Sequence, residues 1–497
     1  MLRKVLTLST GSLLGKLFGL AREILFAAFF GTSAAADAYR AAMTATLAPV
    51  NLFTSEALNA TFIPQFRSDH RNENRSAWTL FNGIGITLLV ISMILGAVLY
   101  LFASPLIGLC FPGFTALQSS LSVKMLKIMS FGIPLYVFSA LCISLEIAHE
   151  QFNLSALRPL VQNAGIIIAM AIAFFGNSPV WIAWGFTGTY IVFSLSGALF
   201  LIKRNILKSG WYHIWNNHRE VFTQFWISLK PMLLFSALLQ CNIILEKTIA
   251  SLIGPGAVAA IDYARMIPET AQLLLIVPLG MVSLSSMVTI GEDMAREQCD
   301  KISSIILILL VPFSGLIFVS APDIINLLYN RGAFNENSIL LTSQTLRGMA
   351  VGTWAVCLSY VLQKIYNARI RNREVLRIGA AGILSNALFN IVAYKYLGVL
   401  AIGIGYSLFG IVMTGFYMRG MGRLQMTAKT AAICFCAFVP YGIIGFLIQD
   451  RLGWTPLPSL MVQTLWTLLY WGIVFVTFPA PRASVRHLFD KLISLKQ

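Results

Sequence analysis

Residues 6–30 read LTLSTGSLLGKLFGLAREILFAAFF, an apolar run that is long enough to cross a lipid bilayer as a helix. The run nevertheless carries three charged residues, Lys16, Arg22 and Glu23. A charge at bilayer depth costs roughly 2.5–3.5 kcal/mol on insertion scales, so such residues usually face a polar interior and mark a substrate path. This one stretch therefore indicates a membrane helix that lines a charged cavity.

Three further apolar runs carry charges in the same way. They hold Asp37, Arg40 and Glu56 in 34–65; Lys230, Glu246 and Lys247 in 223–252; and Asp262, Arg265 and Glu269 in 256–290. Four charged helices around one cavity are typical of a transporter.

The composition excludes an ordinary soluble protein, because 57% of the 497 residues are hydrophobic, 11% are charged and the mean hydropathy is +0.76. We expect an all-α polytopic membrane protein with about 14 transmembrane helices. The predicted spans are 6–30, 34–65, 78–105, 122–147, 156–176, 179–202, 223–252, 256–290, 302–328, 338–366, 375–396, 398–418, 428–449 and 457–479.

The net charge of +16 is distributed in a way that favours membrane orientation over nucleic-acid binding. With the N-terminus inside, the inner loops hold 22 of the basic residues, and the outer loops and adjoining helix ends hold five. The five are Lys124, Lys127, Arg331, Lys395 and Arg451. This positive-inside pattern and an even helix count predict that both termini are cytoplasmic.

The order of the segments predicts two six-helix lobes around a central cavity, followed by two extra helices. Residues 1–202 would form the first lobe and 223–420 the second, and 421–497 would hold the last two helices and a basic tail. The basic, aromatic segment 203–222 would be an amphipathic cytoplasmic linker, although a plain linker is an equal alternative.

Spacing within the charged runs suggests how the residues act. Asp262, Arg265 and Glu269 are three and four positions apart and share one helical face. They would form either a neutral structural network or a latch that opens when an anionic ligand takes the arginine. Because a guanidinium fits phosphate oxygens, a cavity lined by the basic residues of these charged runs would suit a diphosphate or another anion.

Several short motifs follow one another along the chain. The opening motif is Gly15-Lys16-Leu17-Phe18-Gly19-Leu20-Ala21-Arg22-Glu23, which is followed by Ala35-Ala36-Asp37-Ala38-Tyr39. Two short segments in predicted outer loops are Phe111-Pro112-Gly113-Phe114 and Arg331-Gly332-Ala333-Phe334. In this order the motifs resemble those of the MurJ (MviN) lipid II flippases of the multidrug/oligosaccharidyl-lipid/polysaccharide exporter superfamily. The run from Glu56 to Pro64 resembles the family's EGA-like run.

The resemblance implies a cationic substrate cavity lined by the first, second, seventh and eighth spans. Its substrate-binding residues would be Lys16, Arg22, Asp37, Arg40, Glu56, Arg265 and Glu269. Arg22 and Asp37 match family positions directly, whereas Lys16 stands where the family usually has arginine. Residues 49–53 lack the arginine that the family carries near the end of the second span.

The resemblance also implies a sodium ion as a coupling ion in some members. Glu246 falls at the acidic position of the seventh span, and Asn386 and Asn390 form an i,i+4 pair in the eleventh. Oxygen ligands suit such a hard cation, and structural hydrogen bonding is the alternative. No other cofactor is expected.

These observations predict a non-enzymatic flippase of the bacterial inner membrane, acting as a monomer. It would move undecaprenyl-diphosphate-linked peptidoglycan precursor, lipid II, from the inner to the outer leaflet by alternating access. Three alternatives remain at this point: a flippase for another polyprenyl-linked glycan, an ion-coupled drug antiporter, and a membrane glycosyltransferase or polymerase. The last is disfavoured because no predicted outer loop is long enough to build a catalytic face.

Overall fold

The predicted helical class is confirmed. The computed structural model describes residues 2–54, 56–71, 76–203, 219–276, 292–369, 371–422, 425–452 and 455–479. Over these residues each predicted apolar run is helical, and the described part of the chain holds no strand.

Nine of the described helices are long and apolar enough to cross a membrane, or eleven when each of two bent helix pairs counts as one span. These eleven correspond to eleven of the predicted spans. Of the other three predicted spans, 6–30 and 34–65 carry clusters of charged residues, and 256–290 is described only as far as Ile276. The protein is therefore a multi-pass membrane protein, and the total of fourteen spans stays a prediction.

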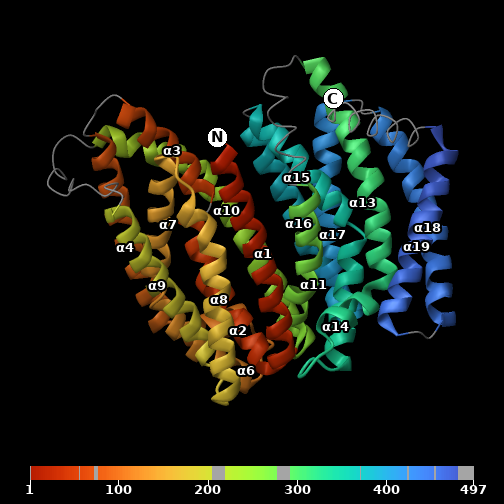
Figure 1. Ribbon diagram of the computed structural model, residues 1–497, viewed down its shortest axis with the longest axis horizontal. Helices are drawn as coiled ribbons and strands as arrows, with labels where there is room; N and C mark the ends of the chain where they lie inside the picture. Colours follow the sequence, from red (N-terminus) through yellow and green to blue (C-terminus); the bar gives the residue numbers. More distant parts are fainter. Residues whose placement is uncertain are drawn as a thin grey trace. The chain divides into compact units, whose positions relative to one another are not determined.

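The chain divides into two compact units, each described here by itself. The first contains the residues up to Val258 together with Arg331–Phe334. Its helices are α1 (Leu2–Phe30), α2 (Ala34–Thr54), α3 (Glu56–Arg71), α4 (Ser76–Leu101), α5 (Ala103–Cys110), α6 (Ala116–Ser130), α7 (Ile133–Ala148), α8 (Asn153–Phe175), α9 (Trp181–Lys203) and α10 (Arg219–Ile253). Within it, α1 packs on α8, α8 on α9, α2 on α6, and α10 on α2 and α3 (Figure 1).

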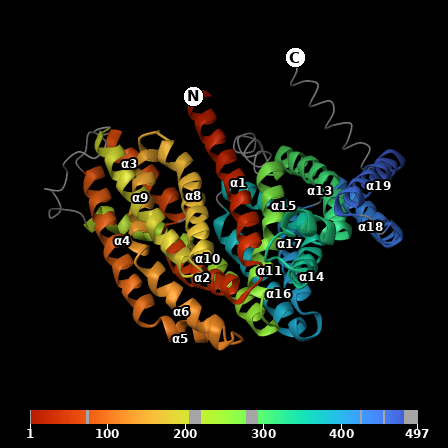
Figure 2. The same ribbon diagram turned by 60° about the horizontal axis from the view of Figure 1, so that its bottom comes forward.

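The second unit contains Ala259–Asn330 and the residues from Asn335 onward. Its helices are α11 (Ala257–Ala271, which begins at the junction), α13 (Glu292–Tyr329), α14 (Glu336–Ala350), α15 (Thr353–Ala368), α16 (Asn372–Leu397), α17 (Val399–Met421), α18 (Gln425–Leu452) and α19 (Pro456–Thr477). The long helix α13 packs on α14, α15, α18 and α19, and α17 packs on α14, α15 and α16. Figure 2 shows α18 and α19 side by side at the edge of this unit.

The predicted lobe boundaries stay a prediction. The compact units are groups of mutual contacts, and the first of them extends beyond residue 202 to include α10. Most of the predicted linker 203–222 lies outside the described residues, which resume at Arg219.

A structural repeat relates the two halves of the chain, as a two-lobed transporter would require. Helix α6 begins after its N-cap Thr115, runs for 15 residues and is followed by the 16-residue α7. Helix α14 begins after its N-cap Asn335, 220 positions later, runs for 15 residues and is followed by the 16-residue α15. The two pairs bend by 47° and 52°, at Gly132 and Gly352 respectively.

Two loops at equivalent places in this repeat pack on the first helices of opposite halves. The backbone N–H of Gly113 donates to Ser251 Oγ near the end of α10, over 3.3 Å. The backbone N–H of Ala333 donates to the carbonyl oxygen of Ala28 near the end of α1, over 2.8 Å. Both loops are motifs of the sequence, Phe111–Phe114 and Arg331–Phe334, so the structure gives these motifs a packing role within the first unit.

Two prolines within the predicted spans lie in different helical surroundings. Helix α10 continues through Pro231. In the eighth predicted span, Pro268 lies inside α11, and a π-helical turn, η2 (Gln272–Ile276), follows directly. Since π-turns relieve a disturbed hydrogen-bond ladder, this segment is a point of local distortion. Pro278 lies outside the described residues.

Candidate functional site

The centre of the candidate site is a three-residue ion-pair cluster on α1 and α2 of the first unit. Glu23 Oε1 lies 2.5 Å from Arg22 Nη2 and 3.3 Å from Arg40 Nη1, and Glu23 Oε2 also pairs with Arg40 Nη2. The side chains of Glu23 and Arg40 are 7% and 8% exposed, whereas that of Arg22 is 20% exposed. The cluster therefore carries one net positive charge, and Arg22 is its most accessible member.

Arg40 is held from several sides. Its guanidinium lies 4.7 Å from the centre of the Phe26 ring, which gives a cation–π contact one turn along α1 from Glu23. The carbonyl oxygen of Arg40 accepts from Thr44 Oγ1 over 2.8 Å. Thr44 Oγ1 in turn accepts from Lys247 Nζ of α10 over 2.9 Å. Lys247 is therefore a second buried cation, held beside α2 one helical turn from Arg40. These contacts connect α1, α2 and α10.

Asp37 is fully buried and holds backbone in place. Its Oδ2 accepts from Gln118 Nε2 of α6 over 2.7 Å and from the backbone N–H of Gly256 over 2.6 Å. Gly256 has a φ of +87°, a conformation that favours glycine. In this conformation Asp37 connects α2, α6 and the turn after α10, and its predicted role toward substrate stays a prediction.

The other predicted residues of the first unit lie at different depths. Lys16 is exposed on α1, six residues or about 9 Å before Arg22. Glu246 is buried on α10, where its Oε1 accepts from Asn242 Nδ2 over 3.1 Å. Glu56 opens α3, and its side chain lies outside the described part of the structure.

The remaining predicted residues belong to the second unit. On α11, Arg265 and Asp262 are half-buried and Glu269 is exposed. On α16, Asn386 and Asn390 are buried, and Asn390 Nδ2 donates to Asn386 Oδ1 over 2.7 Å. The predicted site residues are thus divided between two units, and whether they meet in one cavity stays a prediction.

Several members of the described network were not among the predicted site residues. Glu23 and Lys247 stood out in the sequence as charges in apolar runs, so that signal was present. Phe26 carried no signal, because an aromatic residue one turn from an acid is ordinary in a membrane helix. The partners of Asp37, Gln118 and Gly256, lie 81 and 219 positions away, a separation that no local pattern reports.

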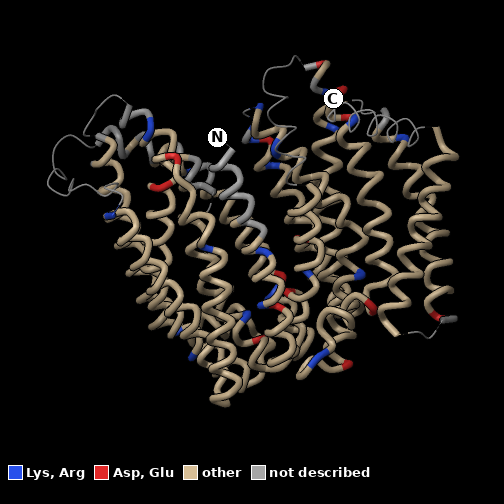
Figure 3. Tube along the Cα trace, viewed as in Figure 1, with Lys and Arg blue, Asp and Glu red and all other residues tan. Residues whose placement is uncertain are grey.

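The cluster can bind an anion without leaving a bare charge behind. If an incoming anion takes the guanidinium of Arg22, Glu23 remains neutralised by Arg40, which holds both of its carboxylate oxygens. Lys16, Arg22 and Glu23 lie in the interior of α1, seven or more residues from either end of the helix. Figure 3 shows how few charged positions interrupt the otherwise tan helices. A polar group at that depth needs a functional reason, because its desolvation is costly.

Comparisons with known proteins agree on one family. A family model described as "Lipid II flippase MurJ" matches residues 26–457. A probable lipid II flippase MurJ of Rhizobium tropici is 26% identical and covers 92% of this chain and 88% of its own length. The lipid II flippase MurJ of Burkholderia cenocepacia is 24% identical, with 95% of this chain and 97% of the relative covered.

Solved structures show the same fold. The structure titled "Lipid II flippase MurJ, inward closed conformation" superposes with a TM-score of 0.78 at 20% identity, covering 95% of this chain and 98% of that one. An inward-facing multidrug transporter of the exporter superfamily superposes with a TM-score of 0.68 at 16% identity, covering 84% and 96%. Because the family model matches most of its length, this chain belongs to the MurJ family of lipid II flippases.

Proposed function

We propose that this protein moves lipid II, the undecaprenyl-diphosphate-linked peptidoglycan precursor, from the inner to the outer leaflet of the bacterial inner membrane. No bond is made or broken in this step. The observation that carries the proposal is the ion-pair cluster of Arg22, Glu23 and Arg40, which keeps one excess positive charge inside a membrane protein of the MurJ family. A diphosphate is the part of lipid II that such a charge recognises.

The proposed mechanism is an exchange of partners at Arg22. In the described state Arg22 pairs with Glu23. An arriving diphosphate offers more negative charge than one carboxylate, so Arg22 turns to the ligand while Arg40 keeps Glu23 neutral. Lys16 extends the cationic path along α1. The exchange would change what holds α1 to α2, and it thereby couples ligand binding to alternating access.

The polyprenyl tail would stay in lipid beside α18 and α19. Large apolar side chains on these helices are uncovered by protein, among them Val439, Ile443, Leu468 and Ile473. Such a surface suits hydrocarbon and not water. The proposal includes cytoplasmic termini, as the basic loops predict, and a monomeric working unit.

Sodium coupling is a further part of the proposal. Asn390 Oδ1 is a buried amide oxygen that accepts no hydrogen bond from the described residues, and Asn386 Oδ1 lies next to it on α16. Amide and carboxylate oxygens are the ligands that a hard cation prefers, so Asn386 and Asn390 in the second unit and Glu246 in the first are each proposed as sodium ligands. Sodium would supply a driving gradient, and transport that is equal in sodium and in choline buffers would remove this part.

Complementation tests the function directly. The chain should support growth of a bacterial strain depleted of its own lipid II flippase, and the Arg22→Ala variant, expressed to the same level, should not. Purified protein in vesicles should move labelled lipid II between leaflets. Failure of the wild-type chain in both assays, despite normal expression, would remove lipid II as its substrate.

A second candidate is a flippase for another polyprenyl-diphosphate glycan. Lys16 in place of the family's usual arginine, and the absence of arginine from 49–53, favour it. The same vesicle assay with an undecaprenyl-diphosphate glycan lacking the peptide decides between the two. Faster movement of that glycan than of lipid II would favour the second candidate.

A further inference from the structure

A pocket at one end of the second unit lies outside all the residues considered so far. It holds about 370 Å³ of empty space, measured out to its open mouth. Four segments contribute to it: the start of α13, the end of α15, the connection from α15 to α16, and the end of α17. Its lining residues are Arg296, Ile365, Tyr366, Arg369, Arg371, Gly420 and Met421.

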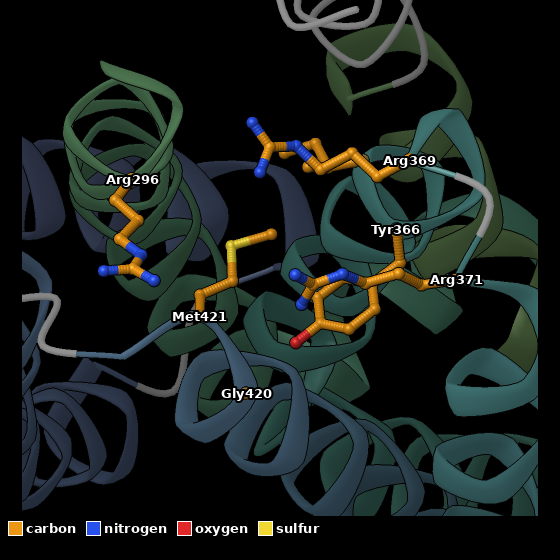
Figure 4. Close-up of a pocket in the computed structure, with 7 residues that line it drawn as sticks. Arg296, Tyr366, Arg369, Arg371, Gly420 and Met421 are labelled. Carbon is orange, nitrogen blue, oxygen red and sulfur yellow. The ribbon is translucent and has the colours of Figure 1, made fainter. Parts of the chain in front are cut away.

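Three of these seven residues are arginines, and none is acidic. They come from different segments: Arg296 from α13, and Arg369 and Arg371 from the connection between α15 and α16. Figure 4 shows Arg369 and Arg371 extending from that connection toward the side on which Arg296 and Met421 lie. Like charges repel, so such a convergence favours an anion between them.

The floor of the pocket is held firmly. The Tyr366 hydroxyl donates to the carbonyl oxygen of Tyr417 over 2.9 Å, which fixes its ring. The Arg371 guanidinium lies 5.8 Å from the centre of that ring. Met421 Sδ accepts from Cys299 Sγ over 3.0 Å. Apolar surface thus lies directly below the cations.

The backbone adds to the positive potential. Arg371 is the N-cap residue of α16, and no side-chain hydrogen bond caps this 26-residue helix. The first turn of a helix presents N–H groups and a partial positive charge, which together favour an anion. The uncapped helix end and three guanidinium groups therefore meet at one hollow.

The acidic residues near the pocket include Asp293, Asp300 and Glu374, and none of them lines it. Thr427 holds the Asp300 carboxylate, and Glu374 lies in the first turn of α16. Asp293 lies 3.7 Å from Arg296, and both side chains are exposed, so this pair contributes little. A Glu374 carboxylate oxygen lies 3.9 Å from where a Cβ at Gly420 would be. A ligand with full phosphate charge competes well against such exposed carboxylates.

We propose that this pocket binds a phosphate group, carried by the headgroup of an anionic phospholipid. The basic residues predict that the loops at this end of the helices face the cytoplasm. Anionic lipid headgroups lie at that membrane surface. The apolar floor beside the cations suits a lipid, whose glycerol and upper chain follow the phosphate. Free phosphate shares the same recognition chemistry, and the experiment separates the two sources. This inference is independent of the proposed transport function.

The test uses the full chain purified in uncharged detergent, with dioleoyl phosphatidylglycerol, dioleoyl phosphatidylcholine and inorganic phosphate as probes. Native mass spectrometry counts retained lipid, and thermal unfolding reports stabilisation. The wild type should retain phosphatidylglycerol over phosphatidylcholine. The double variant Arg369→Gln/Arg371→Gln should bind phosphatidylglycerol about tenfold or more weakly, since each basic residue contributes on the order of a few-fold.

A matched control removes two arginines that do not line the pocket. Arg373 and Arg377 are exposed on α16 close to Arg371. The double variant Arg373→Gln/Arg377→Gln should bind phosphatidylglycerol within about twofold of the wild type, because the lost charge is the same but the pocket is intact. Arg296→Gln, which changes a different helix, should weaken binding even if the first double variant folds poorly.

Each outcome is decisive. Stabilisation by inorganic phosphate that is lost in the pocket variants, without retention of phosphatidylglycerol, would support the site and assign it to free phosphate. Equal binding of phosphatidylglycerol by wild type, Arg296→Gln and the pocket double variant, with no effect of phosphate, would overturn the proposal. An equal loss in the control variant would also overturn it, because general surface charge would then explain the binding.

Discussion

Thr187 Oγ1 on α9 donates a hydrogen bond of 2.9 Å to the carbonyl oxygen of Ile128, one turn before the bend between α6 and α7. The bend leaves this carbonyl without its usual helical donor, because the N–H of Gly132 turns to Met129 instead. The same relationship recurs 220 positions later. Ser407 donates to the carbonyl of Gly348 over 2.6 Å, while the N–H of Gly352 turns to Met349.

A second hydroxyl, seven residues along each helix, extends the parallel. Ser194 Oγ donates to the carbonyl of Leu135 over 2.8 Å, and Thr414 Oγ1 donates to the carbonyl of Ala355 over 2.8 Å. Each bent helix pair is thus hydrogen-bonded to one neighbouring helix, α9 or α17, on both sides of its break. In lipid an orphaned carbonyl is costly, so these hydroxyls allow the bend to exist.

We expect Thr187→Val to lower the free energy of unfolding by about 1 kcal/mol, the usual range for a hydrogen bond between membrane helices. Thr189→Val is the matched control, because Thr189 bonds only to Gly185 of its own helix. Thermal unfolding of both variants in detergent is the measurement. Equal losses in the two variants would mean that the bond across the bend has no special value.

Arg22 and Arg40 should respond differently to truncation, although both pair with Glu23. Arg22→Ala should reduce lipid II movement about tenfold or more with little change in stability, because the lost charge-assisted contacts are to the ligand. Arg22→Lys should be partly active. Arg40→Ala should instead lower stability by roughly 3–5 kcal/mol, because it leaves a buried carboxylate with one partner.

The comparison requires both a transport assay and a thermal-unfolding curve for each variant. Loss of transport and loss of stability in the same proportion for the two variants would show that Arg22 is a structural residue like Arg40. Full transport by Arg22→Ala would remove the anion site at its most accessible residue.

Much of the fold was predictable because a membrane helix has a clear sequence signal, a long run of apolar residues. An apolar run near 20 residues has few alternatives in lipid, so each predicted run is helical where it is described. The breaks within two of these runs were not predicted. Gly352 interrupts its run with no proline beside it, whereas Pro134 follows Gly132 in the first turn of α7. Glycine and proline are both too common in membrane helices to signal a bend.

The repeat also escaped sequence inspection. The equivalent segments share their lengths and their bend, while the hydroxyl donors differ in kind, Thr187 against Ser407 and Ser194 against Thr414. Either residue type supplies the hydroxyl that the carbonyl needs, so the physical requirement persists where residue identity does not. The repeat is therefore visible in the equivalent hydrogen bonds and not in the identities of the residues that make them.

The candidate site shows a different limit. Charges in apolar runs pointed to Arg22, Glu23 and Arg40, since each is expensive at that depth. Their partners could not be read from spacing. Arg40 reaches across to Glu23 on α1, and Asp37 reaches Gln118 on α6. Tertiary packing sets these contacts, and the spacing along one helix does not report them.

Glycines in the two loop motifs should tolerate no side chain. A Cβ at Gly113 would lie 2.1 Å from the carbonyl oxygen of Ser251, and one at Gly332, where φ is +57°, would lie 2.2 Å from that of Ala28. We expect Gly113→Ala and Gly332→Ala each to destabilise the protein by about 1–3 kcal/mol. Gly108→Ala is the control, since a Cβ there meets nothing within 4 Å.

Folded yield and the unfolding midpoint report this prediction. Because alanine is the better helix former, Gly108→Ala in α5 should be neutral or slightly stabilising. If Gly113→Ala matched that control, the Phe111–Phe114 loop would have no packing role at the end of α10.

The topology prediction follows from the basic residues. A reporter that is active only in the periplasm should be inactive when fused after Gln497 and active when inserted after Leu452, between α18 and α19. The excess of arginine and lysine in the predicted inner loops is the cause. A periplasmic signal from the fusion at Gln497 would reverse the orientation of every loop, the arginine-lined pocket included.

Asp262, Arg265 and Glu269 should behave as a coupled set on α11. They share one helical face, and the helix changes to a π-turn just beyond Pro268 and Glu269. Arg265→Ala should abolish transport and lower stability, because two acidic residues lose the cation between them. Glu269→Gln should be milder, since Glu269 is exposed and an amide still accepts a hydrogen bond.

The test is a double-mutant cycle, in which transport and unfolding are measured for Arg265→Ala, Glu269→Gln and the double variant. An interaction energy of roughly 0.5–3 kcal/mol is expected for coupled neighbours, and strict additivity in both measurements would mean that no latch exists on this helix.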